Sequence, residues 1–238
     1  MGIFAKAIGY LLKWIYAVVG NYGISIILLT ILIRLAMFPL YKKQFAYSLS
    51  MQRLQPKLND INTRYANDKK TREEKLSELY QKENVSPASG CLPMLIQMPI
   101  LIGLYTLLRN PLTYISSAEI AIAVHEKFLW INDLSQTDQW WLPIIAAATT
   151  YLSTKLSSAS ADGSANGMTK AMSYFFPILI LVMGRSFPAA LALYWAVGNI
   201  CTLVQQKYFA LTTSKKKLIL DVTEDMRAER KRNRNKKK

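Results

Sequence analysis

The stretch GISIILLTILIRLAMFPLY, residues Gly23 to Tyr41, is apolar enough to cross a lipid bilayer, yet it contains an arginine, Arg34. A bilayer-spanning helix needs about 20 mostly apolar residues. A guanidinium at that depth costs at least ~2.5 kcal/mol, and it cannot lose its charge. The sequence therefore predicts a membrane-spanning helix whose arginine has to reach either the membrane surface or a polar environment inside the protein.

The position of Arg34 leaves two interpretations open. Arg34 precedes Tyr41 by seven residues, which is about 10 Å along a helix, so its side chain can snorkel part of the way to that surface. However, Lys42 and Lys43 already supply basic anchors there, and Thr30 lies one turn before Arg34 on the same helical face. Both observations favour a polar cavity inside a helical bundle.

The composition indicates a membrane protein without catalytic chemistry. The chain has 238 residues, 51% of them hydrophobic, and a formal charge of +15. This combination suits a multi-spanning protein with basic cytoplasmic segments. Cys91 and Cys201 are far apart, the single His125 falls in a loop, and there is no phosphate-binding loop or nucleophile motif. We expect no metal site, no cofactor and no enzymatic activity.

The remaining apolar stretches predict four further spans, giving an all-α protein with five transmembrane helices. They run from about Leu92 to Leu108, from Trp140 or Trp141 to Leu156, from Ala171 to Met183 and from Ala189 to Phe209. Each of three spans carries polar residues: Gln97 in the second, Thr149, Thr150, Ser153 and Thr154 in the third, and a stripe of Trp195, Asn199, Thr202 and Gln206 in the last. The spacing of that stripe, 4, 3 and 4 residues, places it on one helical face. A stretch of linker composition, 157–167, separates the third and fourth spans.

Residues 1–20 predict an amphipathic helix that lies along the membrane surface. Lys6 and Lys13 share one face, and Tyr10, Trp14 and Tyr16 are residues typical of membrane interfaces. An uncleaved signal sequence is the alternative, although no small-residue cleavage site stands out.

Residues 42–90 predict a helical hairpin outside the membrane. Its first half carries apolar residues at coiled-coil spacing, chiefly Met51, Leu54, Leu58 and Ile61. Pro56 should kink or restart this helix, Asn67 and Asp68 supply a turn, and a capping box beginning at Thr71 starts the second helix. The alternative is a helical linker without partners, which would not need such an apolar seam.

Charge orients the five predicted spans. Residues 42–90, the loop 155–170 and the tail from Lys207 hold 24 of the 30 Lys and Arg residues, and five spans place all three on one side. The loop 110–139 on the other side is mainly acidic. The positive-inside rule makes the basic side cytoplasmic, with the N-terminus outside and the C-terminus in the cytoplasm.

The C-terminal tail, 211–238, is expected to be disordered and to bind polyanions. Its partner is either anionic lipid headgroups or nucleic acid, for which ribosomal RNA is the attractive candidate. The tail residues expected to make these contacts are Arg230, Lys231, Arg232, Arg234, Lys236, Lys237 and Lys238.

Four segments together resemble the YidC/Oxa1/Alb3 family of membrane protein insertases, in its five-span, Gram-positive-type form. They read LTILIRLAMFPLY, MQRLQPK, GCLPMLIQMPI and LYWAVGN. The resemblance covers residues 1–210, which we expect to form a single insertase domain. Two departures from the family's pattern bear on the form expected. No long periplasmic domain precedes the first span, which argues against a Gram-negative form, and no lipobox cysteine lies near Met1, so a lipid anchor is expected only if the start is truncated.

The resemblance implies five helices around a hydrophilic groove that is open to the cytoplasm and to lipid, in the bacterial cell membrane. It implies nascent membrane proteins as substrates, a cytoplasmic hairpin that receives them, and contacts with the Sec translocon and the signal recognition particle receptor. In this interpretation Arg34 attracts acidic or polar parts of the incoming chain. The groove residues are Arg34, Thr30, Gln97, Thr150, Trp195, Asn199 and Gln206.

Two other classes of function stay open on the residues alone. A small transporter or channel would use Arg34 as an anion site, but it usually shows internal repeats and several intramembrane charges. A membrane-anchored ribosome receptor would leave Arg34 and the polar stripes unexplained. The resemblance favours the insertase over both.

Overall fold

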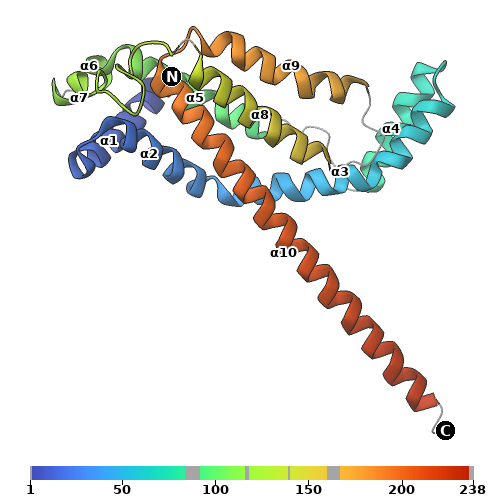
Figure 1. Ribbon diagram of the computed structural model, residues 1–238. Helices are drawn as coiled ribbons and strands as arrows, with labels where there is room; N and C mark the ends of the chain where they lie inside the picture. The colour runs from blue at the N-terminus through green and yellow to red at the C-terminus, as the bar shows by residue number, and fades with distance from the viewer. Residues whose placement is uncertain (1, 84–91, 116–117, 139, 160–166, 236–238) are drawn as a thin grey trace.

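The computed structural model describes residues 2–83, 92–115, 118–138, 140–159 and 167–235, and these fold into helices joined by short connections (Figure 1). Within them there are no named strands, only the isolated bridges Phe128–Ile131 and Thr137–Pro188. The helices are α1 (Gly2–Val19), α2 (Tyr22–Ala36), α3 (Phe38–Arg64), α4 (Lys69–Lys82), α5 (Leu92–Arg109), α6 (Pro111–Tyr114), α7 (Ala118–Ala123), α8 (Trp141–Ala159), α9 (Gly167–Gly184) and α10 (Ala189–Asn235). The prediction of an all-α protein is confirmed.

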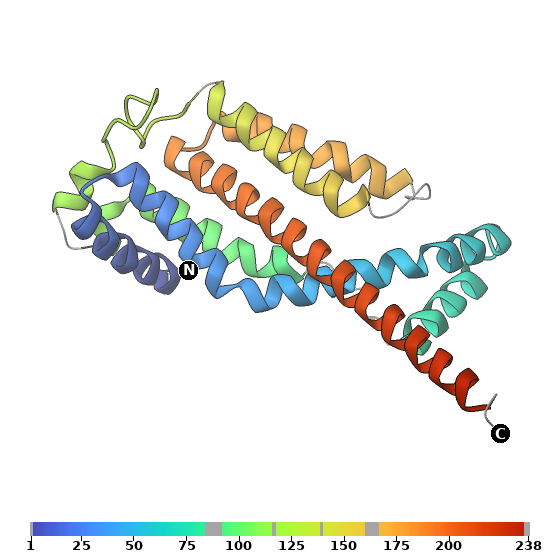
Figure 2. The ribbon, with the colours of Figure 1, turned by 60° about the horizontal axis from the view of Figure 1, so that its bottom comes forward.

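Helix α10 is the element around which the others are arranged. It contacts α2, α3 and α5 on one side and α8 on another, and α9 packs against α8 (Figure 2). Helices α1, α2 and α5 form a second group, in which α1 contacts both of the others. Residues that are far apart in sequence therefore meet along the first half of α10.

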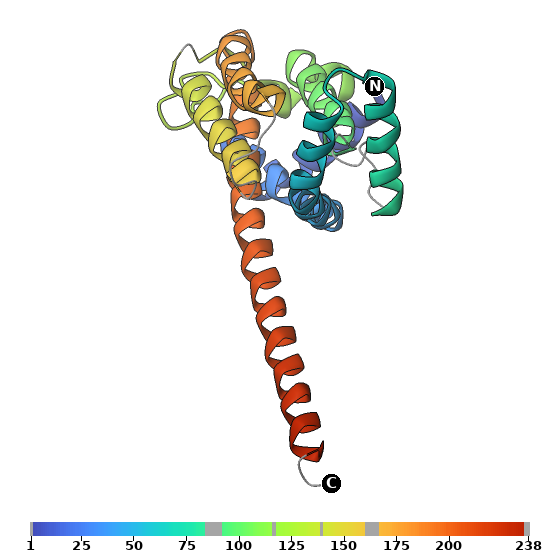
Figure 3. The same ribbon diagram turned by 90° about the vertical axis from the view of Figure 1, so that its right-hand side faces the viewer.

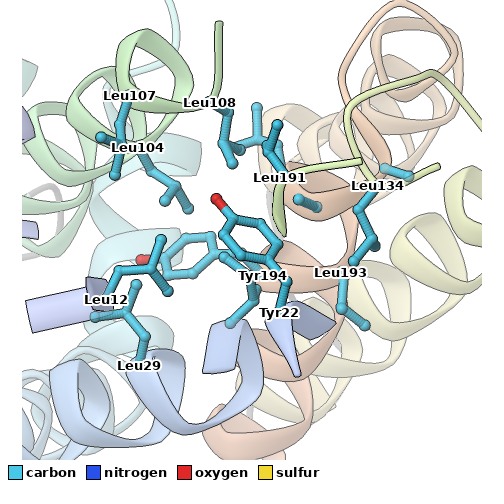
Figure 4. Packing of buried hydrophobic residues seen from close by; sticks show 14 of the residues in the cluster. Leu12, Tyr22, Leu29, Leu104, Leu107, Leu108, Leu134, Leu191, Leu193 and Tyr194 are labelled. Carbon is cyan, nitrogen blue, oxygen red and sulfur yellow. The ribbon is translucent and has the colours of Figure 1, made fainter. Parts of the chain in front are cut away.

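The apolar core lies where α1, α2, α5 and the start of α10 converge. Tyr22 and Tyr194 are each 1% exposed, and leucines from all four helices surround their rings (Figure 4). Leu134, from the connection before α8, inserts into the same cluster and is fully buried. Burial of this apolar surface fixes the position of α10 relative to α2.

The connection between α5 and α8 contributes more to the fold than its acidic composition indicates. The backbone N–H groups of Ala189 and Ala190, at the start of α10, donate to the carbonyls of Gln136 and Leu134 at 2.7 and 3.0 Å. The sequence predicts only a polar loop for this segment, 110–139. Its buried side chains form a structured cap over one end of the helices.

Two carboxylates fasten this cap to the helices. Glu126 accepts hydrogen bonds from the Tyr16 hydroxyl of α1 and, at 2.8 Å, from the Tyr22 backbone N–H of α2. Asp138 accepts from the Trp130 indole and from backbone N–H groups in the first turn of α8. Burial raises the pKa of Asp138, but these hydrogen bonds outweigh it and lower the pKa below its usual range.

Helix α1 packs against the bundle along one face and leaves the other face open. Ala5, Leu12 and Ile15 are buried, whereas Ile3 and Val18 are more than 70% exposed. The exposed face of α1 is thus largely apolar, whereas the sequence predicts a face marked by Lys6 and Lys13. Gly20, at a φ of 67°, ends α1, and the Asn21 side chain caps α2 by accepting from Ile24 N at 3.0 Å.

Length and composition single out few candidate spans among the described residues. Helix α1 is long and apolar enough to cross a membrane, and α2 with the first part of α3 qualifies as a second candidate if that bent pair counts as one span. The segment Tyr174–Gly184 of α9 is a shorter apolar helix. The remaining predicted spans coincide with α5, α8 and α10, and their crossing of a bilayer stays a prediction.

A bend that the sequence did not predict interrupts the helix of the first predicted span. Helix α2 stops at Ala36, and α3 begins at Phe38 after a bend of 61°. Pro39 lies in the first turn of α3, where its missing N–H costs nothing and its fixed φ suits a helix start. The predicted stretch to Tyr41 is thus divided between two helices, Tyr41 belongs to α3, and the extent of the span stays a prediction.

Helices α3 and α4 form the predicted hairpin, which projects from the bundle in Figure 1 and faces the viewer in Figure 3. Leu54 and Leu58 are about 5% exposed, and Lys57 Nζ lies 2.5 Å from Glu83 Oε1 at the end of α4. Helix α3 continues through Pro56, so it does not restart there, and a kink at Pro56 stays a prediction. The predicted capping box at Thr71 was wrong, because α4 is capped by Asp68, which accepts from Thr71 N at 3.1 Å. Residues 84–90 of the hairpin segment lie outside the described residues.

Helix α10 continues well past the predicted end of the last span. It reaches Asn235, so the backbone of the basic tail is helical where we expected disorder. The sequence after Gly198 contains neither glycine nor proline, and it is rich in lysine, arginine, leucine and alanine, which favour helices. Lys236–Lys238 and most of the predicted linker between α8 and α9 lie outside the described residues.

The packing of α1 can be tested with two neighbouring leucines. We expect Leu12→Ala to destabilise the protein by about 2–5 kcal/mol, because it leaves a cavity in the core. Leu11, which is 37% exposed, is the matched control, and Leu11→Ala should cost much less. The measurement is the thermal unfolding midpoint of each variant in the same detergent, and equal midpoints would contradict the packed position of α1.

Candidate functional site

Arg34, in the last turn of α2, is a buried cation held by neutral groups. Its side chain is turned toward α3 and α10, and the residue is only 9% exposed. Its Nη1 donates to the Tyr41 hydroxyl at 2.6 Å and to Thr202 Oγ1 at 3.0 Å, and its Cζ lies 5.3 Å from the centre of the Tyr41 ring. The side chain therefore extends toward the Tyr41 end of the span, as in snorkelling, but it ends inside the bundle.

No carboxylate neutralises this charge within the described residues, since none of their ion pairs includes Arg34. The Nε donor of Arg34 is buried without a hydrogen-bond partner. A buried charge without a counterion is costly, and an unsatisfied donor adds to that cost. These two features make Arg34 a candidate anion site.

Gly198 on α10 makes room for the guanidinium. A Cβ atom at this position would lie 2.5 Å from Arg34 Nη2, closer than any real contact. The absence of a side chain lets the arginine lie against the α10 backbone beside Thr202. In the sequence, the only signal for this role is the spacing of Gly198 four residues before Thr202.

A second polar cluster joins α10 to α8. Trp195 Nε1 donates to Thr150 Oγ1 at 3.0 Å, and the side-chain amide of Asn199 lies 2.8 Å from the same oxygen. The Thr150 hydroxyl itself donates to the carbonyl of Ala146, one turn earlier, at 2.6 Å. Three of the predicted groove residues are therefore brought together and satisfy one another between packed helices.

The other predicted groove residues lie apart from this cluster. Gln97 donates to the Tyr194 hydroxyl at 2.8 Å and so ties α5 to α10. Thr30 is fully buried, and its hydroxyl donates to the Ile26 carbonyl of its own helix at 2.7 Å. Gln206 is half-buried on the wall of a pocket. The predicted set thus divides between two faces of α10, one toward α2 and α5 and the other toward α8.

A pocket of about 870 Å³ adjoins Arg34 on the side of the hairpin and the tail. Arg34 does not line it, but three residues that contact Arg34 do: Tyr41, Thr202 and Gln205, whose Nε2 donates to the Arg34 carbonyl at 3.4 Å. Most of the wall is apolar, and the polar positions cluster on α3 and α10. The remaining lining residues are Gln44, Phe45, Ser48, Leu49, Leu152, Leu156, Leu203, Val204, Gln206, Lys207, Phe209, Ala210 and Thr213.

Sequence reasoning missed three members of this site. Tyr41 was taken as the end of a span, and Tyr194 and Gly198 were not singled out. Tyrosine and glycine are common in apolar helices, so their type carries little information. Their roles depend on how α2, α3 and α10 meet, and the sequence pattern of one helix does not contain that information.

Comparison with known proteins identifies the family. A family model described as "60Kd inner membrane protein" matches residues 14–216. The chain belongs to this family. The resemblance to the YidC/Oxa1/Alb3 family is thereby confirmed.

Relatives of this 60Kd inner membrane protein family are named as insertases. The "Membrane protein insertase YidC" of Wigglesworthia glossinidia brevipalpis is 37% identical over 85% of this chain and 36% of its own length. The protein of the same name from Mannheimia succiniciproducens is 38% identical over 90% and 38%. A solved structure, "Active YidC insertase crystal structure with the first transmembrane domain resolved", matches with a TM-score of 0.65 at 29% identity, covering 87% of this chain and 45% of that one. The chain spans little more than a third of the length of these curated relatives.

The close approach of Gly198 and Arg34 can be tested by a double-mutant cycle. Gly198→Val should destabilise the protein by about 1–3 kcal/mol, because its side chain overlaps the guanidinium. In an Arg34→Ala background the same substitution should cost clearly less, because its neighbour is gone. Thermal unfolding of the four proteins in detergent measures this coupling, and equal costs in both backgrounds would show that the two residues are independent.

Proposed function

We propose that this chain is a membrane protein insertase, which moves hydrophilic segments of nascent membrane proteins across the bilayer and releases their apolar helices into lipid. The observation that carries the proposal is Arg34, a buried cation with no counterion among the described residues. It lies in an α-helical chain of a family whose named relatives are insertases. Acidic and polar parts of an incoming chain are the groups that this arginine would attract.

Transfer would use the bundle to shorten the apolar distance. A polar segment in hydrocarbon loses its hydrogen bonds with water, at several kcal/mol per unsatisfied group. In our proposal, five spans enclose a groove that is open to the cytoplasm and lined by Arg34, Thr30, Gln97, Thr150, Trp195, Asn199 and Gln206. The pocket beside Tyr41 would be its mouth. Partitioning of the substrate's apolar helix into lipid supplies the free energy.

The proposed orientation follows from charge. We place the hairpin and the tail in the cytoplasm and the acidic 110–139 cap outside, in the bacterial cell membrane. In this orientation the hairpin would meet substrates or targeting components first. Of its predicted contact residues Met51, Leu54, Leu58 and Ile61, Met51 and Ile61 are half-buried and could be reached directly, whereas Leu54 and Leu58 are buried. The Sec translocon and the signal recognition particle receptor are the proposed partners there.

The groove charge can be tested by reconstituting the purified protein in liposomes. The substrate is a single-span protein with an acidic N-terminal tail, and its insertion is read by protease protection. We expect Arg34→Ala to slow insertion at least tenfold, whereas Arg34→Lys retains much of the rate because it keeps the charge. Arg109→Ala is the control, because Arg109 is exposed on α5 and contacts Tyr105 at 2.7 Å, away from the site.

The outcomes separate the competing functions. Insertion by wild type with normal insertion by both Arg34 variants would refute the groove charge and keep the insertase. No insertion by wild type, together with anion flux through the liposomes, would favour a transporter. Ribosome binding without insertion would favour a membrane-anchored receptor.

The basic tail provides a separate test of partner class. We propose that residues 230–238 bind polyanions, so their deletion should weaken binding and flatten its dependence on salt. Co-flotation with vesicles containing anionic lipid and co-sedimentation with ribosomes, each at several salt concentrations, compare the two partners. Unchanged binding in both assays would contradict a role of the tail.

A further inference from the structure

We propose that Tyr41 is a displaceable cover over Arg34, which closes the anion site at rest and is exchanged for a substrate carboxylate when the site is used. This inference rests on the proposed function, because it specifies how that same site is opened. It concerns a residue that is no part of the predicted groove, and it assigns to Tyr41 control over access to the charge.

The position of Tyr41 between the arginine and the pocket is the first observation. Tyr41 is 8% exposed; it holds Arg34 Nη1 at 2.6 Å, and it lines the pocket of about 870 Å³ that Arg34 itself does not reach. Its side chain therefore belongs both to the arginine's contacts and to the pocket wall. Displacement of the Tyr41 ring would connect the pocket with the guanidinium.

The incomplete satisfaction of Arg34 is the second observation. Its Nη1 has two neutral acceptors, Tyr41 and Thr202, while the buried Nε has none. A carboxylate can accept two parallel hydrogen bonds from a guanidinium, and such charge-assisted pairs are stronger than bonds to a hydroxyl. Exchange of the phenol for a carboxylate therefore improves the arginine's interactions, whereas exchange for a neutral group gains little. The cover thus favours acidic segments.

The placement of Tyr41 on the hairpin arm is the third observation. Arg34 belongs to α2 and Tyr41 to α3, and the 61° bend at Met37 separates them. Helix α3 continues without a break into the hairpin with α4. A change of angle at this junction moves Tyr41 relative to Arg34, so a chain that pulls on the hairpin also uncovers the charge.

The native cysteine Cys201 reports on the cover without requiring insertion. Cys201 is half-buried on α10, next to Thr202, whose hydroxyl binds Arg34. In a Cys91→Ser background it is the single thiol of the chain. Its reaction rates with an anionic and a cationic methanethiosulfonate reagent give a charge-selectivity ratio for the space around Arg34.

We expect Tyr41→Phe to raise this anionic-to-cationic ratio several-fold, because the ring remains but its hydroxyl no longer binds the guanidinium. Tyr41→Ala should raise it further, and Arg34→Ala should abolish the increase in a double variant. Tyr22→Phe is the matched control, because it removes the hydroxyl of a buried tyrosine at the other end of α2. An unchanged ratio in Tyr41→Phe, including a Cys201 that remains unreactive toward both reagents, would overturn the proposal.

Insertion kinetics then distinguish the cover from the proposed function. With acidic and amide-substituted versions of the same substrate tail, Tyr41→Phe should raise the insertion rate of the acidic tail more than that of the amide tail, because the guanidinium no longer binds the hydroxyl and attracts a carboxylate more strongly. Loss of insertion in Tyr41→Phe to the level of Arg34→Ala would overturn the cover and keep the insertase. A wild type that inserts neither tail would refute the proposed function, while the thiol ratio still decides whether Tyr41 covers Arg34.

Discussion

The burial of one uncompensated guanidinium is the constraint on which the arrangement of these helices depends. Arg34 cannot discharge, and no carboxylate among the described residues pairs with it. Two other helices converge on it: α3 supplies the Tyr41 hydroxyl and ring, and α10 supplies the Thr202 hydroxyl and the open space at Gly198. Such neutral contacts reduce the cost of the charge without cancelling it, which leaves the site receptive to an anion.

Helix α10 can contact the buried Arg34 and also bind α8, because it presents two different polar faces. Gly198 and Thr202 face Arg34, while Trp195 and Asn199 bind Thr150 on α8. Interhelical hydrogen bonds of this kind supply specificity where apolar packing alone distinguishes poorly between neighbouring helices. The same helix is anchored at its start by the cap residues Leu134 and Gln136. The contacts at its start and along its polar faces together fix the position of α10 relative to α2.

The sequence predicts the helices well because apolar length is a property of each segment alone. Arg34, Gln97 and Asn199 could also be singled out, since a polar side chain in an apolar helix is visible in one dimension. The bend after Ala36 and the roles of Tyr41 and Gly198 could not, because they arise where three helices meet. The start of α4 shows a different error: a local motif predicted a cap at Thr71, and Asp68, three residues earlier, supplies it. The helical tail is a similar case, in which charge predicted disorder against good helix propensity.

The polar residues of the bundle mostly satisfy one another, and this bears on how a hydrophilic segment could enter. Thr30 and Thr150 donate to backbone carbonyls of their own helices, and Gln97 binds Tyr194. A folded bundle cannot leave many buried polar groups without partners. In the proposed insertase, entry of a polar chain is then an exchange of hydrogen bonds rather than the filling of unpaired ones. In such an exchange, the entering chain is selected by the group whose charge is least compensated by its hydrogen-bond partners within the protein. In this bundle that group is Arg34.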